Sequence, residues 1–200
     1  MLQKKRLALQ SREKTGTIRC TPTIGDNEKR KRGRPCDSCD MMSSTDTIKS
    51  NISGKSFKVP NGNCRTRSLI YMAQCSLCKV QYVGQTTTPL RERISGHRSW
   101  MKKKKDNNDV VDQEGKFKRE DEAVCAEHIK NSHGCQTTSE FNSVYKFTVL
   151  ALNPSAGLDK AEQQWISNLV TMVPCGLNIA KPCGVADGQL TMHNKRQGQG

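Results

Sequence analysis

Two cysteines and two histidines have the ligand types and local spacings of a zinc site. The cysteines form the pattern Cys75-x-x-Cys78, and the histidines are His128 and His133. Thiolates and imidazoles are the donors that tetrahedral Zn²⁺ takes in structural sites, where four protein ligands leave no open position. The long stretch between the two pairs is unlike that of a free-standing zinc finger. Cys125 is a competing ligand, and the alternative to a metal site is a set of unliganded thiols. We expect a structural zinc that staples a hairpin turn to a helix end.

A second set of cysteines lies upstream. Cys36 and Cys39 again have the Cys-x-x-Cys spacing, and Cys64 follows them. These three could form a second zinc site, with Cys20 as a further ligand. Three ligands fall short of four, so free cysteines are an equally good interpretation.

Glu162 is a candidate ligand for a harder metal ion. The segment 157–170 has the apolar period of an amphipathic helix, and Glu162 stands four residues from both Leu158 and Ile166, on or beside the buried face. An unpaired carboxylate is costly there. Mg²⁺ accepts oxygen ligands and often takes only one or two protein carboxylates. The alternative is a boundary glutamate paired with Lys or Arg.

Arg93 and His97 are four residues apart, so they share one face of a helix expected over about 89–103. A guanidinium can make two parallel contacts with a phosphate and stabilise the charge that develops on it. Arg91 competes for this role, and a surface arginine beside a structural histidine is the alternative.

The elements that must position these residues follow from the apolar pattern. Strands are expected over 69–73 and 80–84 with a turn between them, and again over 144–152; helices are expected over 89–103, 123–131 and 157–170. The charged stretch 102–122 reads as an exposed loop. The order β-β-α-α-β-α predicts an α+β domain.

Several short motifs in this order resemble one known family, the GIY-YIG nucleases. Both tyrosine half-motifs are present, although Leu69 replaces the first glycine, and they are followed by the family's helix, late glutamate and asparagine. The motifs are Ile70-Tyr71, Tyr82-Val83-Gly84, Leu90-Arg91-Glu92-Arg93 with His97, Glu162-Gln163-Gln164-Trp165-Ile166, and Pro174-Cys175-Gly176-Leu177-Asn178. Cys75 and Cys78 between the tyrosines, with Cys64 upstream, are similar to the nuclease domain of Penelope-like retroelements, which normally follows a reverse transcriptase.

The resemblance implies a small domain at 64–180, with a central antiparallel sheet flanked by helices and the Cys-Cys-His-His zinc set built in. It implies Tyr71 as the base that activates water and Tyr82 as the residue that positions water or phosphate. Tyrosine titrates near pH 10, so such a base must be acidified by its neighbours. By the same resemblance Arg93 and His97 act on the phosphate, Glu162 holds Mg²⁺ or Mn²⁺, and Asn178 braces the site.

Charge predicts the partner. The net charge is +14 and the pI about 9.5, which favour an acidic polymer because neutralised phosphates release counterions. Nucleic acid is the first expectation and a membrane surface the second, and the family resemblance makes DNA the expected partner. Residues 1–55 are polar and basic and are expected to be mostly disordered, as are 181–200. The cluster at 29–35 resembles a nuclear-import signal or an AT-hook, so we expect a nuclear protein. The alternative for this cluster is a solvated charge run. No apolar run could span a membrane, and no secretory signal is evident.

The predicted function is therefore metal-dependent nicking of DNA by phosphodiester hydrolysis, in a retroelement-derived endonuclease that cleaves target sites. Two other classes compete with it. One is a catalytically inactive, co-opted DNA-binding protein that kept its zinc and basic tail. The other is an RNA-binding zinc module, although a chain that is only 4% aromatic offers few stacking platforms for bases.

Overall fold

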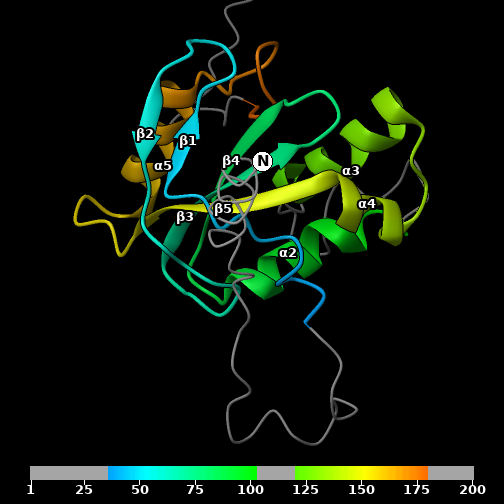
Figure 1. Cartoon of the computed structure of the whole chain (residues 1–200), viewed down its shortest axis with the longest axis horizontal. Helices are drawn as coiled ribbons and strands as arrows, with labels where there is room; N and C mark the ends of the chain where they lie inside the picture. Colours follow the sequence, from blue (N-terminus) through cyan, green and yellow to red (C-terminus); the bar gives the residue numbers. More distant parts are fainter. Residues whose placement is uncertain (1–35, 103–119, 180–200) are drawn as a thin grey trace, which may run out of the picture.

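The computed structural model describes residues 36–102 and 120–179, and within them it has a mixed α+β fold (Figure 1). Its elements in chain order are β1 (Thr47–Lys49), β2 (Ser56–Lys58), β3 (Leu69–Cys75), β4 (Gln81–Thr86), α2 (Leu90–Ser99), α3 (Glu120–His133), α4 (Thr138–Val144), β5 (Tyr145–Leu152) and α5 (Leu158–Leu169). The described part thus contains a three-stranded antiparallel sheet, a two-stranded hairpin and four helices. The α+β prediction is confirmed.

The three-stranded sheet has β3 at its centre, in the order β4-β3-β5. Tyr71 stands opposite Gly84 on β4 and opposite Val149 on β5. Both faces of β3 are covered, which explains why this strand is apolar at nearly every position instead of alternating. Six of the seven side chains of the central strand are therefore buried, and only Gln74 is partly exposed.

The two faces of the sheet carry separate apolar clusters. Tyr71, Tyr82 and Ala73 pack into one with Leu90 and Ile94 of α2 and with residues of α3 and α4. Ile70, Met72 and Val83 point the other way, into a cluster with Ala161, Ile166 and Leu169 of α5. Because successive residues of a strand face opposite sides, the sheet separates these groups. Figure 1 shows α2, α3 and α4 gathered on one side of the sheet and α5 with the β1–β2 hairpin on the other.

The expected elements are present, and the sequence pattern missed one helix. Helix α4 is only seven residues long, and a capping box starts it: the Thr137 side chain accepts from the Glu140 N–H while the Glu140 carboxylate accepts from the Thr137 N–H. Thr137 and Glu140 have the spacing typical of that signal. The helix is too short for an apolar period to reveal it.

The start of the folded part differs from the prediction. Residues 36–58 were expected to belong mostly to a disordered tail, yet they form a turn and the β1–β2 hairpin. Ile48 is buried, and the Phe57 ring packs edge-on against Trp165 of α5 with centroids 5.6 Å apart. Three-residue strands with so few apolar residues lack a visible period of two, which is why the sequence concealed them. The other predicted tail segments, 1–35 and 181–200, and the loop 103–119 lie outside the described residues.

No helix in the described ranges is long and apolar enough to cross a bilayer.

Candidate metal centre and tyrosine cluster

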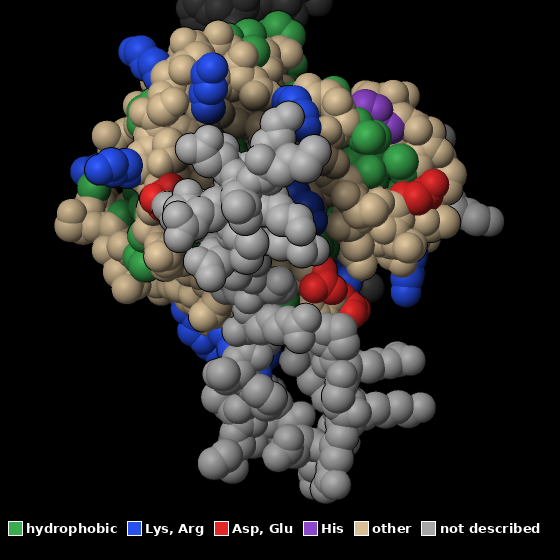
Figure 2. Space-filling view, viewed as in Figure 1, with side chains coloured by type: hydrophobic (Ala, Val, Ile, Leu, Met, Phe, Trp, Pro, Cys, Tyr) green, Lys and Arg blue, Asp and Glu red, His purple; other side chains and the backbone are tan. Residues whose placement is uncertain are grey.

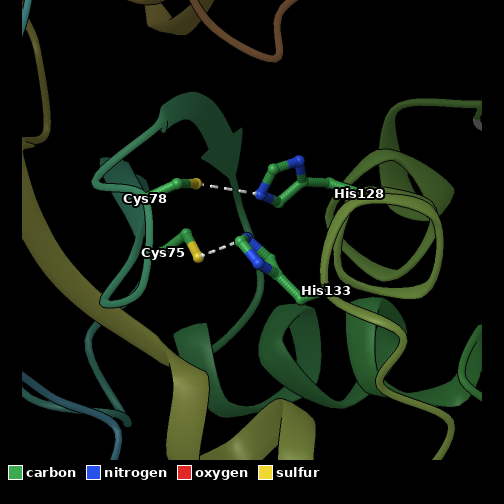
Figure 3. Close-up of side chains that lie close together, drawn as sticks. All are labelled: Cys75, Cys78, His128 and His133. Atoms are coloured by element: carbon green, nitrogen blue, oxygen red, sulfur yellow. Dashed lines mark hydrogen bonds between the residues drawn. The ribbon is translucent and has the colours of Figure 1, made fainter.

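The predicted zinc ligands come together at one end of the sheet. Cys75 is the last residue of β3, and Cys78 lies on the turn that leads to β4. The turn closes with a hydrogen bond from the Lys79 N–H to the Cys75 carbonyl (2.9 Å), and Lys79 takes a positive φ of 66°. His128 and His133 come from the C-terminal part of α3. Figure 3 shows all four side chains pointing toward one another.

The distances between these donors match a tetrahedral zinc site. Cys75 Sγ lies 3.6 Å from His133 Nε2, and Cys78 Sγ lies 3.3 Å from His128 Nε2. Zn–S bonds of about 2.3 Å and Zn–N bonds of about 2.0–2.1 Å at tetrahedral angles separate S and N by about 3.5 Å. All four donor atoms lie within 4.8 Å of one another. The cluster could hold a zinc ion with little rearrangement.

Burial shifts the pKa of one thiol and of one imidazole in this cluster in the direction that favours their neutral forms. Burial raises the pKa of the Cys75 thiol, and backbone hydrogen bonds at Cys78 and Leu77 only partly offset it. Burial, together with the neighbouring His133, lowers the pKa of His128, so its imidazole is neutral at pH 7 with a lone pair available. Ser132 Oγ lies 3.3 Å from His128 Nδ1, a contact that leaves Nε2 directed at Cys78.

Cys125, the competing ligand, belongs to the apolar layer instead. It is fully buried on α3, and its carbonyl accepts a hydrogen bond from the Tyr145 hydroxyl (3.1 Å). Its sulfur is not among the four clustered donors. The tertiary structure therefore brings together the four residues that the spacings favoured and leaves Cys125 outside the cluster.

A second cluster surrounds the hydroxyl of Tyr71. Arg93 Nε donates to Tyr71 Oη over 2.9 Å, and His97 Nε2 lies 2.8 Å from the same oxygen. The Tyr82 ring packs against both aromatic neighbours, with centroids 6.3 Å from Tyr71 and 5.6 Å from His97. Arg93 is 7% exposed and His97 fully buried. Four predicted site residues from β3, β4 and α2 thus meet in one place.

Gly84 makes room for the Tyr71 hydroxyl, a role that the sequence motif alone did not explain. A Cβ at Gly84 would stand 2.5 Å from Tyr71 Oη and 2.9 Å from a ring carbon of Tyr82. Gly84 faces Tyr71 directly across the β3–β4 ladder. A larger residue there would therefore force the Tyr71 phenol, the Tyr82 ring or the backbone of β4 to shift.

Asn178 is bound to the edge strand of the sheet. Its side-chain oxygen accepts from the Val83 N–H (2.9 Å), and its side-chain amide donates to the Val83 carbonyl (2.7 Å). The side chain therefore satisfies two backbone groups on the open edge of β4, and it fastens the segment after α5 to the strand that carries Tyr82 and Gly84.

Glu162 lies on α5 and is 4% exposed. Gln85 of β4 donates from Nε2 both to Glu162 Oε2 (3.2 Å) and to Asp159 Oδ1 (2.5 Å). Sequence analysis did not single out Asp159, although its position three residues before Glu162 puts it on the same helix face. Helix α5 covers the sheet face opposite α2, so this carboxylate pair and Arg93 come from opposite sides of the sheet.

The second cysteine set also converges. The sulfur atoms of Cys36, Cys39 and Cys64 lie within 4.8 Å of one another, while Cys20 lies outside the described residues.

Comparison of the sequence with models of protein families and with curated proteins, and of the structure with solved structures, yielded no match.

Proposed function

We propose that this chain is a GIY-YIG-type endonuclease that nicks DNA by metal-dependent phosphodiester hydrolysis. The observation that carries the proposal is the position of the Tyr71 hydroxyl, held between the Arg93 guanidinium and the His97 imidazole. A phenol becomes a useful base only where a cation stabilises its oxyanion and a second group takes its proton. Both neighbours are present at hydrogen-bonding distance.

The proton can be followed through these three side chains. Because Arg93 Nε–H donates to Tyr71 Oη, the phenolic proton is available to His97 Nε2 when the imidazole carries its own proton on Nδ1. Transfer of the phenolic proton to Nε2 leaves an imidazolium and a phenolate, which Arg93 stabilises. The phenolate then takes a proton from water, and the resulting hydroxide attacks phosphorus. The P–O bond to one strand end breaks, and its leaving oxygen takes up the proton that the His97 imidazolium gives back, so that both side chains return to their starting state.

The carboxylate pair on α5 supplies hard oxygen donors. Asp159 and Glu162 both accept from Gln85, and Glu162 is nearly buried, a setting in which a divalent cation would stabilise the two charges. In this proposal they would hold Mg²⁺ or Mn²⁺, which would supply positive charge to the phosphate. Because the pair and Arg93 come from opposite sides of the sheet, the proposal requires the phosphate to lie across the edge strand β4, between the two groups. Asn178 keeps the adjoining strand in place.

DNA is the proposed substrate and the nucleus the proposed location. Basic side chains outnumber acidic ones by 33 to 19 over the whole chain, and Figure 2 shows Lys and Arg spread over the visible face. Such a charge attracts a polyphosphate and weakens binding as salt rises. The Cys-x-x-Cys between the tyrosine motifs supports an origin in a Penelope-like element, where a reverse transcriptase would be the partner.

One observation favours a second function, that of a zinc-containing DNA-binding protein without catalysis. Tyr71 and His97 are fully buried, and Arg93 nearly so. A phenol–guanidinium–imidazole network can stabilise a core without meeting a substrate. In that case the hydrogen bonds would matter for stability alone.

The test is conversion of supercoiled plasmid to open circles by the full-length, zinc-loaded chain, with and without Mg²⁺ or Mn²⁺. Arg93→Lys and Glu162→Gln should each lower the nicking rate by about 100-fold or more while DNA binding persists. Arg98→Lys on the same helix and Glu127→Gln, an exposed residue of α3, are matched controls that should nick normally. A folded wild type that binds DNA but never nicks it would establish the non-catalytic function instead.

A further inference from the structure

Three thiols outside the predicted active site meet at the start of the folded part. Cys36 and Cys39 occupy a turn before β1, closed by a hydrogen bond from the Cys39 N–H to the Cys36 carbonyl (2.7 Å). Cys64 lies on the loop before β3. Cys39 and Cys64 are buried at 4% and 0% exposure, and Cys36 is partly exposed. Two segments separated by the β1–β2 hairpin thus contribute sulfur atoms to one spot.

The separations of these sulfurs identify what they can hold. Cys64 Sγ lies 3.5 Å from Cys39 Sγ and 3.7 Å from Cys36 Sγ. A disulfide would bring two sulfurs to about 2.05 Å. Four Zn–S bonds of about 2.3 Å at tetrahedral angles place neighbouring sulfurs about 3.8 Å apart. The two distances from Cys64 are close to this value, and all three sulfurs lie within 4.8 Å of one another, so the set is compatible with three corners of a zinc–thiolate tetrahedron.

We propose that Cys36, Cys39 and Cys64 bind a second ion of a thiophilic metal, Zn²⁺. Thiolates are soft ligands that select zinc over Mg²⁺ or Ca²⁺, and the Cys-x-x-Cys turn directs two of them to the same side. The three thiolates would fill three of the four positions of a tetrahedral ion. This site shares no ligand with the Cys75–His133 cluster.

The second ion would fix the start of α2. Pro89, at the N-cap of this helix, makes no side-chain hydrogen bond to it. Two backbone carbonyls cap the helix instead. The Thr66 carbonyl accepts from the Leu90 N–H (3.0 Å), and the Cys64 carbonyl accepts from the Arg91 N–H (2.7 Å). A metal on Cys64 holds the loop that caps the helix bearing Arg93 and His97. This positioning effect bears on catalysis only if the proposed function holds, whereas metal binding stands independently.

The same ion would fasten the N-terminal segment to the main sheet. The Phe147 N–H donates to the Met41 carbonyl (2.7 Å), and the Ser43 N–H donates to the Phe147 carbonyl (2.8 Å), so the chain just after Cys39 runs beside β5. The segment would then be held at two places, by the ion on Cys36 and Cys39 and by the hydrogen bonds to Phe147 of β5. The cluster links residues 36–43, the loop before β3 and the first turn of α2.

The experiment measures zinc per chain in the full-length protein after dialysis against a chelating resin. Wild type should retain two ions, since two donor clusters are present. Cys36→Ser and Cys64→Ser should each retain one, Cys75→Ser should lose the other, and Cys175→Ser, an exposed cysteine outside both clusters, should retain two. One ion in wild type, with no loss in Cys64→Ser, would overturn the proposal.

Sulfur-to-metal charge-transfer absorbance of the Cd²⁺-substituted protein provides a readout that does not depend on activity. Cys36→Ser is the decisive variant because its side chain is partly exposed and its replacement should leave the circular dichroism spectrum unchanged. It should lose the absorbance of the three-thiolate site and keep that of Cys75 and Cys78. Unchanged absorbance would exclude metal at the upstream cysteines. A failure of plasmid nicking would leave both measurements intact, so the two proposals are separable.

Discussion

The Cys75–His133 cluster and the cluster around Tyr71 differ in what their side-chain types and distances indicate. The first brings two sulfurs and two imidazoles within 4.8 Å of one another, with sulfur–nitrogen distances of 3.6 and 3.3 Å, and this donor set could hold a zinc ion. The phenol, guanidinium and imidazole around Tyr71 already satisfy one another in a buried site. Donor types and distances therefore show that the first cluster could hold zinc, whereas the second cluster has two interpretations, catalysis and stability, that experiments must separate.

Removal of zinc should have the largest effect. The Cys75–His133 cluster joins α3 to the β3–β4 turn, and structural zinc contributes roughly 10 kcal/mol to the folding of small domains that depend on it. Stripping the metal with a chelator, or Cys75→Ala, should lower the Tm by at least about 10 °C in calorimetry.

Cys175→Ala is the matched control for Cys75→Ala because Cys175 is exposed and lies in neither cluster. Its melting curve should equal that of wild type. Zinc loss after chelator treatment must be verified. If the Tm is then unchanged, the four donors form only a packing cluster and do not differ in this respect from the cluster around Tyr71.

Tyr71→Phe should separate catalysis from stability. Loss of the hydroxyl leaves Arg93 Nε without the acceptor it now uses, which should cost about 1–3 kcal/mol in the free energy of unfolding. If Tyr71 is the base, nicking should fall by about 100-fold or more. Denaturant titrations and plasmid nicking measure the two effects.

Tyr145→Phe provides the matched control in the same apolar layer. Tyr145 is also fully buried, and its hydroxyl donates to the Cys125 carbonyl. Its stability cost should resemble that of Tyr71→Phe, while the folded fraction should nick normally. Equal losses of nicking in both variants would mean that the Tyr71 hydroxyl acts only through stability.

Gly84→Ala should have a smaller effect of the same kind. The added methyl group would press on the Tyr71 hydroxyl and the Tyr82 ring, so we expect a cost of about 1–3 kcal/mol and a nicking rate lowered by roughly 10- to 100-fold. Gly62→Ala is matched in crowding, because its Cβ would stand 2.6 Å from a Val149 methyl carbon. That variant should be destabilised yet nick normally once folded; a loss of nicking equal to that of Gly84→Ala would remove the special role of Gly84.

Much of the fold could be predicted because its long elements have clear periods. The central strand, the helix with Arg93 and His97, and the amphipathic α5 are found close to their expected bounds. Helix α4 and the β1–β2 hairpin could not be predicted, since seven- and three-residue elements are too short for a period and depend on contacts such as Phe57 with Trp165. The hydrogen bond between Gln85 and Asp159 could not be predicted either, because the two residues are far apart in the sequence.

By itself, the sequence determined which side chains are near neighbours along one element. A Cys-x-x-Cys turn brings two sulfurs together, and a four-residue spacing puts Arg93 and His97 on one helix face, because local backbone geometry sets both. The tertiary structure alone decided which distant pairs meet: Cys75 and Cys78 with the α3 histidines, Cys64 with Cys36 and Cys39, and Asn178 with Val83. These contacts depend on strand register and on the packing of helices against the sheet. Neither can be predicted from the local spacing of residues.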